Sequence, residues 1–225
     1  MAEAGFVHLH VHSEYSILDG ACRIPALAAR AAELEMPAVA LTDHGSLAGA
    51  VELVRETGKH GVKPLIGCEV YVAEDRRAQK KGYAHLTLLA ENNAGYRNLI
   101  KLSSTGYLEG YYYKPRVDWE LLESHSEGLI ALSGCLSGRV CKALEENRPD
   151  DARSDLDRLA EVFGRDSTSL LAASTLIASR STVRLTDGSS LKSSSIWTAS
   201  PGRSSPRRMR TPISWTTAPC RPRRG

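Results

Sequence analysis

Histidines at alternate positions near the start of the chain are the residues best suited to chemistry. The stretch FVHLHVH, residues 6–12, places His8, His10 and His12 two positions apart. Successive side chains of a strand point to opposite faces, so we expect the three imidazoles to share one face. Neutral imidazole is a common metal ligand, and this spacing lets neighbouring ligands converge. A solvated polar strand face is the alternative interpretation.

Ligand-type residues also follow other predicted strands. Asp43 and His44 come after PAVALT, Glu69 lies late in KPLIGCEVYVA, and Cys135 follows GLIALSG. Site residues of parallel α/β proteins gather at the carboxyl ends of strands. We therefore expect four successive strands to deliver ligands to one rim.

Two further residues fit this rim less well by position alone. His85 begins its predicted strand, AHLTLLA, and by itself suggests a core or surface histidine. Asp19, in the turn LDG, is by itself typical of a turn. The mixture of imidazole, carboxylate and thiolate suits Zn²⁺, or Mn²⁺ and Fe²⁺ where carboxylate and imidazole dominate. More than four ligands imply more than one ion, an arrangement suited to phosphoester hydrolysis.

The elements that must position these residues alternate along residues 6–163. Apolar, β-branched runs take turns with helical patterns such as IPALAARAAELE, where Pro25 suits a helix start, and LAGAVELVRETGKHG, which Gly61 could close. This alternation predicts an α/β fold with a parallel sheet, open or closed into a barrel. No phosphate-binding loop, nucleophile elbow or dinucleotide fingerprint competes with the metal interpretation.

Composition narrows the class of protein. The 225 residues allow one large or two small domains, and 42% hydrophobic residues suffice for a core. There is no membrane-length apolar run and no signal-like leader, so we expect a cytoplasmic protein. The five cysteines are odd in number and form no Cys-x-x-Cys pair, which argues against a disulfide framework and a zinc ribbon.

The charge is divided unevenly along the chain. Residues 166–225 hold ten Lys and Arg against two Asp and Glu, whereas residues 1–165 are mildly acidic. We therefore divide the chain into a metal-binding domain, 1–165, and a Ser/Arg-rich tail, 166–225. The tail is either a disordered segment whose charge suggests nucleic-acid binding, or not the natural C-terminus.

Six motifs in order closely resemble the PHP (polymerase and histidinol phosphatase) domain family, in the form found at the N-terminus of bacterial DNA polymerase III alpha subunits. They are FVHLHVHSEYSILDGA, PAVALTDHGSLAGAVE, GVKPLIGCEVYVA, HLTLLAENNAGYRNLIKLSS, YYYKPRVDWELL and GLIALSGCLSG. The resemblance covers about residues 6–165. It implies a distorted (β/α)7 TIM-like barrel with up to three metal ions at its carboxyl rim, here incomplete at the C-terminal end.

The family's metal ligands fall on residues of this chain that match its motifs. They are His10, His12, Asp19, His44, Glu69, His85 and Cys135, seven of the usual nine. The resemblance implies catalytic roles for Asp43, His44 and Glu69, with Asp43 orienting or supporting its neighbour. His8 matches a position that supports the site or packs in the barrel.

The resemblance implies a part of a replicative DNA-directed DNA polymerase, with DNA and other replisome subunits as partners. An intact ligand set is similar to that of members with metal-dependent 3′-to-5′ exonuclease activity, which makes proofreading a hypothesis. A stand-alone phosphatase of the histidinol-phosphatase type and a catalytically silent scaffold are the alternatives.

The stretch GYYYKPRVD, residues 110–118, mixes aromatic and basic side chains. Tyr112, Lys114 and Arg116 could hold single-stranded DNA through stacking and phosphate contacts. A packed loop anchored by tyrosines is the equally weighted alternative.

The chain departs from the family pattern near its end. The last two ligands should come from an Asp-x-His motif after a strand, but residues 166–225 contain no histidine. If the arginines from Arg203 to Arg210 are CGN codons, the serines TCN and the prolines CCN, regrouping the bases by one position permits a strand followed by Asp-x-His. We hypothesise a shifted reading frame after about Arg165, which would make the tail's basic charge a product of GC-rich codons.

Overall fold

The computed structural model describes residues 6–169 of the chain. Most of the predicted tail and its hypothesised frame shift therefore lie outside the described residues. Ordered structure runs a few residues past the predicted boundary at 165, because Ala131 N donates to Ser167 O. In chain order the elements are α1 (Ile24–Glu33), β1 (Ala38–Leu41), α2 (Ala50–Lys59), β2 (Lys63–Val72), β3 (Ala84–Ala90), α3 (Asn93–Leu108), β4 (Tyr111–Tyr112), β5 (Lys114–Val117), α4 (Trp119–Ser124), β6 (Leu129–Leu132), α5 (Arg139–Glu145), α6 (Pro149–Phe163) and β7 (Thr168–Ser169).

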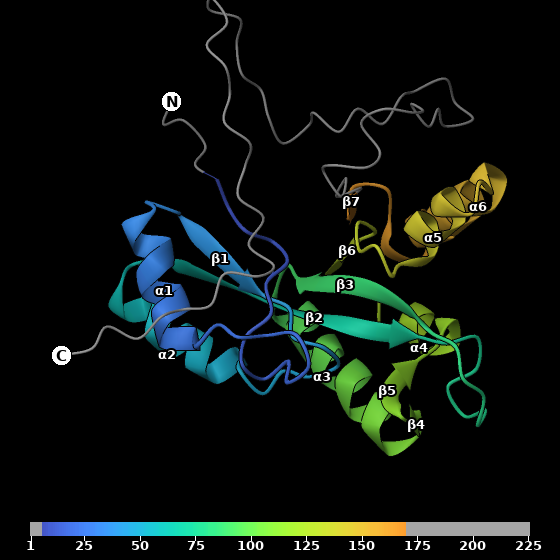
Figure 1. The fold of residues 1–225 in the computed structure, drawn as a ribbon, viewed down its shortest axis with the longest axis horizontal. Coiled ribbons are helices and arrows are strands. Elements are labelled where there is room, and N and C mark those ends of the chain that lie inside the picture. Colours follow the sequence, from blue (N-terminus) through green and yellow to red (C-terminus); the bar gives the residue numbers. More distant parts are fainter. Residues whose placement is uncertain (1–5, 170–225) are drawn as a thin grey trace, which may run out of the picture. The chain divides into compact units, whose positions relative to one another are not determined.

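The strands form a mixed sheet around the long strand β2 (Figure 1). β1 pairs in parallel with the first half of β2, and β3 pairs antiparallel with its second half. β5 is parallel to β2, β6 is antiparallel to β3, and β7 is parallel to β6. The expectation of a parallel sheet was therefore wrong. Residues 73–83 contain no helix, so the chain turns back directly into β3.

The sheet is open over the described residues. Its order is β4-β5-β2-β3-β6-β7, with β1 beside β2, and β4 and β7 lie at opposite ends of that path. The described part of the chain is thus an α/β fold with an unclosed sheet.

The histidine stretch at residues 6–12 is not a regular strand, which corrects a second expectation. It forms one bridge, between His8 and Val39, and two bonds, from Ala40 N to His8 O and from Thr42 N to Val11 O. Between these two hydrogen bonds the histidine stretch advances three residues, from 8 to 11, while the β1 segment advances two, from 40 to 42. The histidine stretch therefore carries one extra residue, as in a β-bulge. The extra residue breaks the alternation, and Leu9 and Val11 pack into different core clusters.

Both helical patterns named from the sequence form helices, α1 and α2, and local sequence explains several helix ends in the described residues. Pro25 lies in the first turn of α1. Gly61, at φ 69°, follows the end of α2. Asn92 caps α3 by accepting from the N–H groups of Ala94 and Gly95.

Two large apolar clusters support the sheet. The first, around Ile24, Val39 and Leu53, joins α1 and α2 to β1. The second runs from β2 and β3 to α3, α5 and α6, with Leu88 and Leu99 fully buried. The side chains discussed below therefore extend from a packed scaffold. No helix in the described range is both long and apolar enough to span a membrane.

Candidate metal centre

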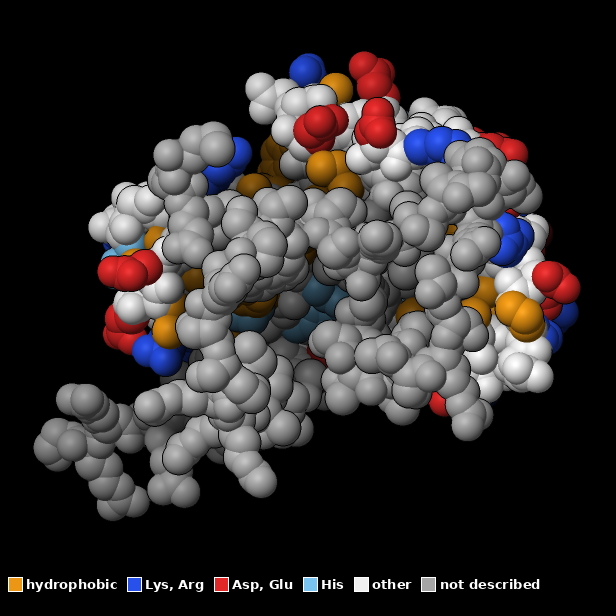
Figure 2. All heavy atoms as spheres, turned by 90° about the horizontal axis from the view of Figure 1, so that it is seen from above, with side chains coloured by type: hydrophobic (Ala, Val, Ile, Leu, Met, Phe, Trp, Pro, Cys, Tyr) orange, Lys and Arg blue, Asp and Glu red, His pale blue; other side chains and the backbone are white. Residues whose placement is uncertain are grey.

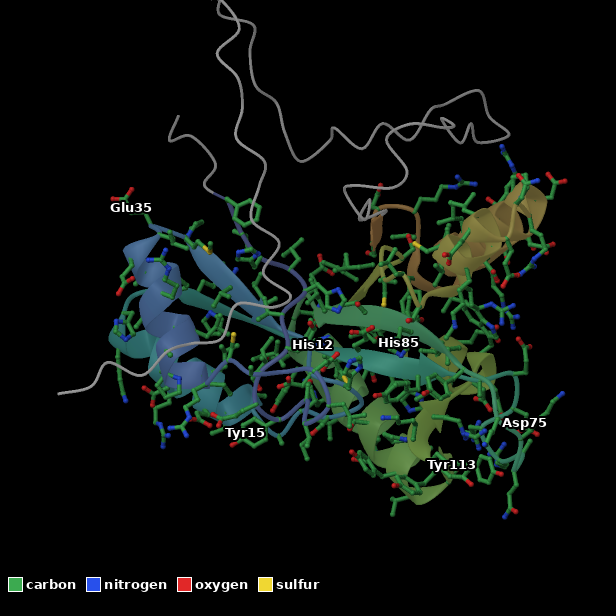
Figure 3. All side chains as sticks on the ribbon, in the orientation of Figure 1. His12, Tyr15, Glu35, Asp75, His85 and Tyr113 are labelled. Atoms are coloured by element: carbon green, nitrogen blue, oxygen red, sulfur yellow. The ribbon has the colours of Figure 1, made fainter. Side chains whose placement is uncertain are left out.

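Glu69 is the centre of the histidine cluster. Its side chain is 1% exposed, and its Oε2 lies 2.6 Å from both His10 Nε2 and His12 Nε2. Its Oε1 lies 2.6 Å from His85 Nδ1. Figure 3 shows His12 and His85 beside each other, although they come from distant parts of the sequence. Seen from above, histidine side chains lie near the middle of the molecule's face (Figure 2).

Cys135 completes this side of the cluster. Its Sγ lies 3.0 Å from Glu69 Oε1 and 3.6 Å from His85 Nδ1. Burial, together with the charge of Glu69, raises the pKa of the Cys135 thiol to about 12. A nearby cation has the opposite effect on a thiol, since it favours the thiolate.

Asp19 and His44 form the other side. Asp19 Oδ2 lies 2.9 Å from His44 Nε2 and 3.2 Å from His12 Nδ1. His44 Nδ1 is buried without a hydrogen-bond partner, 3.8 Å from Glu69 Oε2. A buried ring nitrogen without a partner is costly, and a ligand in this space would satisfy it.

The titration of the cluster follows from its charges. Burial raises the pKa of Glu69, but hydrogen bonds from three imidazoles outweigh burial and hold that pKa well below its usual range. Burial lowers the pKa of His12, but the hydrogen bonds and charges of Glu69 and Asp19 outweigh it and raise that pKa. Burial dominates for His44 and lowers its pKa. Glu69 is therefore a fixed anion that can attract cations.

The antiparallel direction of β3 explains why His85 joins the site from the start of its strand. His85 pairs with Tyr71 near the carboxyl end of β2. The first residues of β3 thus lie at the rim where the parallel strands end. Cys135, just after β6, reaches the same place because Leu132 pairs with Thr87 of β3.

Asp43 is buried and positions a turn. Its two carboxylate oxygens accept hydrogen bonds from Ser13 N at 2.6 Å, Ser13 Oγ at 2.7 Å and Ser16 Oγ at 2.7 Å. These bonds hold the turn that leads to Asp19. The backbone of the next residues is fixed to β2, since Glu69 N donates to Asp43 O and Gly45 N to Glu69 O.

Comparisons with known proteins agree with this geometry. Residues 8–170 match the sequence model of the PHP domain. The chain belongs to the PHP domain family. Three relatives are named DNA polymerase III subunit alpha: those of Borreliella burgdorferi (46% identical, 72% of this chain, 15% of that protein), Thermus aquaticus (46%, 71%, 14%) and Deinococcus radiodurans (49%, 71%, 13%). The chain spans only about 15% of the length of these curated relatives.

Six side chains of the PHP domain form three overlapping groups that could hold a metal ion. Their ligand atoms lie within 4.8 Å of one another in each group. The groups are His10, His12 and Glu69; His12, Asp19 and His44; and His44, Glu69 and His85. Nitrogen and carboxylate donors around the partnerless nitrogen of His44 fit divalent cations. Cys135 lies beside the third group and could add a thiolate.

His8 stands apart from the metal-binding groups of the PHP domain. Its ring packs edge-on against Phe6, with 4.6 Å between centroids, and burial lowers its pKa. Its expected role, support of the site or packing in the barrel, stays a prediction.

The residues expected to hold nucleic acid are placed very differently from one another. Arg116 is 2% exposed, and its guanidinium donates to the carbonyls of Gly110, Lys80, Arg76 and Ala78. Arg116 thus anchors the segment before β3 and does not offer its charge to a phosphate.

Tyr112 and Lys114 of the PHP domain are partly exposed. The ammonium of Lys114 lies 5.3 Å from the ring centroid of Tyr71. Sequence reasoning missed Tyr71, which stacks on His44 with 5.5 Å between centroids. Its position two residues after Glu69 places it on the same side of β2, and that alternation was the available signal.

Proposed function

We propose that residues 6–169 form the metal-dependent phosphoesterase domain at the N-terminal end of a bacterial replicative DNA polymerase, and that it removes nucleotides from DNA 3′ ends. The observation that carries the proposal is the buried Glu69 carboxylate shared by three histidines. Relatives named DNA polymerase III subunit alpha support the polymerase assignment.

The parent protein would catalyse template-directed DNA synthesis. The chain corresponds to a small part of its relatives, so the proposal assigns no nucleotidyl-transfer step to it. DNA and other replisome subunits as partners, and a cytoplasmic location, go with the proposed parent. Closure of the open sheet into a (β/α)7 barrel by further residues is part of the same proposal.

The seven candidate ligands would hold Zn²⁺, Mn²⁺ or Fe²⁺. Bound cations would acidify a water molecule and neutralise charge on a phosphoester. The family pattern suggests up to three ions. A neutral imidazole has one lone pair, and the three groups share His12 and His44, so the described residues suit two ions better than three.

The chain's own residues have separate roles in this proposal. Glu69 fixes the positions of His10, His12 and His85 through its two oxygens. Asp43 orients the turn toward Asp19 and acts as a positioning residue.

The test uses the purified 225-residue chain, stripped with chelator and reloaded with each cation in turn. We expect bound metal and shortening of a 5′-labelled single-stranded oligonucleotide from its 3′ end, both lost in Glu69→Gln. Glu91, an exposed residue outside the cluster, provides the matched control Glu91→Gln.

Two other results would replace the proposal. Turnover of histidinol phosphate without oligonucleotide shortening would indicate a stand-alone phosphatase. Absence of bound metal in a folded chain would indicate a silent scaffold.

A further inference from the structure

Aromatic and basic side chains extend outward from one side of the metal centre. We call Lys81, Tyr83, Tyr113 and Lys114 the tyrosine–lysine rim. Tyr83 stacks on His85, with 5.9 Å between centroids and 11° between planes, yet remains 37% exposed. It also meets Tyr71 edge-on at 5.0 Å. An exposed aromatic face thus lies directly against a candidate metal ligand.

Lys114 lies at the inner end of the rim. Tyr71, which its ammonium contacts, stacks in turn on His44. Pro115, the residue after Lys114, packs closely against the turn that follows His44. A Cβ added to Gly45 in that turn would lie only 2.6 Å from Pro115 Cγ. Lys114 is therefore held close to the metal centre by the packing of its neighbour.

The charge of Lys114 has no anionic partner within residues 6–169. The side chain is half-buried, and no carboxylate of the described chain forms an ion pair with it. A partly desolvated ammonium beside an aromatic ring is favourably placed to bind an incoming anion. A phosphate group near the metal centre meets this requirement.

Tyr113 and Lys81 form the outer end. The Lys81 ammonium lies 5.3 Å from the ring centroid of Tyr113, which is 66% exposed. Tyr113 has φ 61°, a left-handed conformation that a bulky residue seldom adopts. Strained residues of this kind cluster at binding sites. In Figure 3 Tyr113 lies near the segment that carries Asp75, away from His12.

We propose that the tyrosine–lysine rim binds single-stranded DNA on its way to the metal centre. Lys114 contacts a backbone phosphate, and Tyr83 and Tyr113 provide stacking surfaces for bases. Of the three residues predicted from the sequence, the rim keeps Lys114, has Tyr113 in place of Tyr112 and Lys81 in place of the buried Arg116, and adds Tyr83. The inference deepens the proposed function, on which its direction toward the metal centre rests.

The experiment measures binding of a fluorescein-labelled dodecamer of thymidylate to the full 225-residue chain by anisotropy. Chelator is present, so cleavage cannot interfere. The variants are Lys114→Met, Tyr83→Leu and Tyr83→Phe. The matched control for Lys114→Met is Lys101→Met, at an exposed lysine of α3. The matched control for the Tyr83 variants is Tyr107→Leu. Tyr107 is an exposed tyrosine that stacks on the ring of Tyr111, as Tyr83 stacks on the ring of His85.

Each variant has its own expected signature. Lys114→Met weakens binding several-fold and lowers the slope of log K against log salt by about 0.7, the value for one phosphate contact on a single strand. Tyr83→Leu weakens binding about tenfold without changing the slope, because stacking is uncharged. Tyr83→Phe retains the ring and binds like the original chain.

Several results would overturn the inference. They are failure of the folded chain to bind the oligonucleotide, equal losses in the control variants, or an unchanged slope in Lys114→Met. Loss of inorganic phosphate binding in Lys114→Met, with no effect of Tyr83→Leu on oligonucleotide binding, would indicate a small phosphate substrate instead. Oligonucleotide binding through the rim without 3′-end shortening would leave the inference standing and remove the proposed nuclease function.

Discussion

Glu69 is the residue on which the metal centre depends most. Its carboxylate is buried and accepts from three imidazoles, so both oxygens are committed. Replacing it with Gln keeps the shape but removes the charge that balances the cations. The amide N–H₂ of Gln can also donate hydrogen bonds to the ring nitrogens. Those nitrogens must keep a free lone pair to bind metal.

We predict that Glu69→Gln lowers metal affinity at least tenfold. Isothermal titration with Zn²⁺ and elemental analysis of the purified chain measure the effect. The exposed Glu91→Gln should bind metal as the original chain does. Unchanged metal content in Glu69→Gln would mean that Glu69 is only a structural acceptor.

The pH dependence of stability should separate the metal-free and metal-bound protein. The raised pKa of His12 stabilises the metal-free fold below about pH 6.5, and this contribution is lost as pH rises through the folded-state pKa. The lowered pKa of His44 acts oppositely, since its contribution is lost as pH falls.

Metal binding requires both imidazoles to be neutral. We therefore predict that the increase in Tm produced by Zn²⁺ grows as pH is raised from about 5.5 to 8. Thermal denaturation with and without the ion measures it, and an increment that does not change with pH would contradict ligation by these histidines.

At the scale of elements, the segment 73–83 depends on a buried ion pair. Arg76 is 5% exposed and contacts both carboxylate oxygens of Asp118, which also caps α4 through Leu121 N. Burial raises the pKa of Asp118, but hydrogen bonds from the backbone and from Arg76 lower it overall. This arrangement fixes the segment that ends in Tyr83 and leads to His85 in β3.

We predict that Asp118→Ala lowers the free energy of unfolding by about 3 kcal/mol, because it removes a helix cap and the buried partner of Arg76, which then keeps only the more exposed carboxylates of Glu109 and Glu120. Urea denaturation measures the loss. Arg77 is an exposed neighbour that forms ion pairs with Glu109 and Glu120. It gives the control Arg77→Met, which we expect to cost less than about 1 kcal/mol of unfolding free energy. Equal costs would contradict the central role of the buried pair.

The turn between β4 and β5 should trade stability for binding. Tyr113 occupies a left-handed conformation there, so Tyr113→Gly should raise the free energy of unfolding by about 1 kcal/mol while weakening oligonucleotide binding. Denaturation and anisotropy on the same samples test both halves. A variant that is stabilised but binds equally well would remove Tyr113 from the proposed rim.

The sequence predicted the helices, and the side chains that gather around Glu69, better than it predicted strand direction. Helix ends carry local signals, such as Pro25 and Asn92. Strand direction instead depends on whether a helix lies between two strands. Residues 73–83 contain no helix, and this was the sign of an antiparallel pair that sequence reasoning missed. The bulge near Leu9 and the burial of Arg116 depend on partners distant in the sequence, so no local pattern reveals them.

At the scale of the whole molecule, the number of bound metal ions tests whether residues outside 6–169 supply ligands. The candidate metal-binding groups of residues 6–169 overlap, because they share His12 and His44. We predict at most two tightly bound ions per chain, measured by native mass spectrometry after removal of excess metal. Three ions would mean that residues outside this range supply ligands.

The proposed shift of reading frame makes a companion prediction. A chain read in the alternative frame after about Arg165, with the expected Asp and His restored, should bind more metal than the present one. Sequencing the encoding DNA checks the premise. An unbroken frame with AGR arginine and AGY serine codons would reject it.

The candidate ligands of the proposed metal centre would also assemble in a fixed order during synthesis. His10 and His12 leave the ribosome long before Cys135, which still contacts Glu69 across a separation of 66 residues. At typical bacterial elongation rates, roughly ten seconds pass between the first and last of these ligands. A nascent chain would therefore expose an incomplete set of these candidate ligands for that interval, and an ion available during synthesis would reach the proposed centre first.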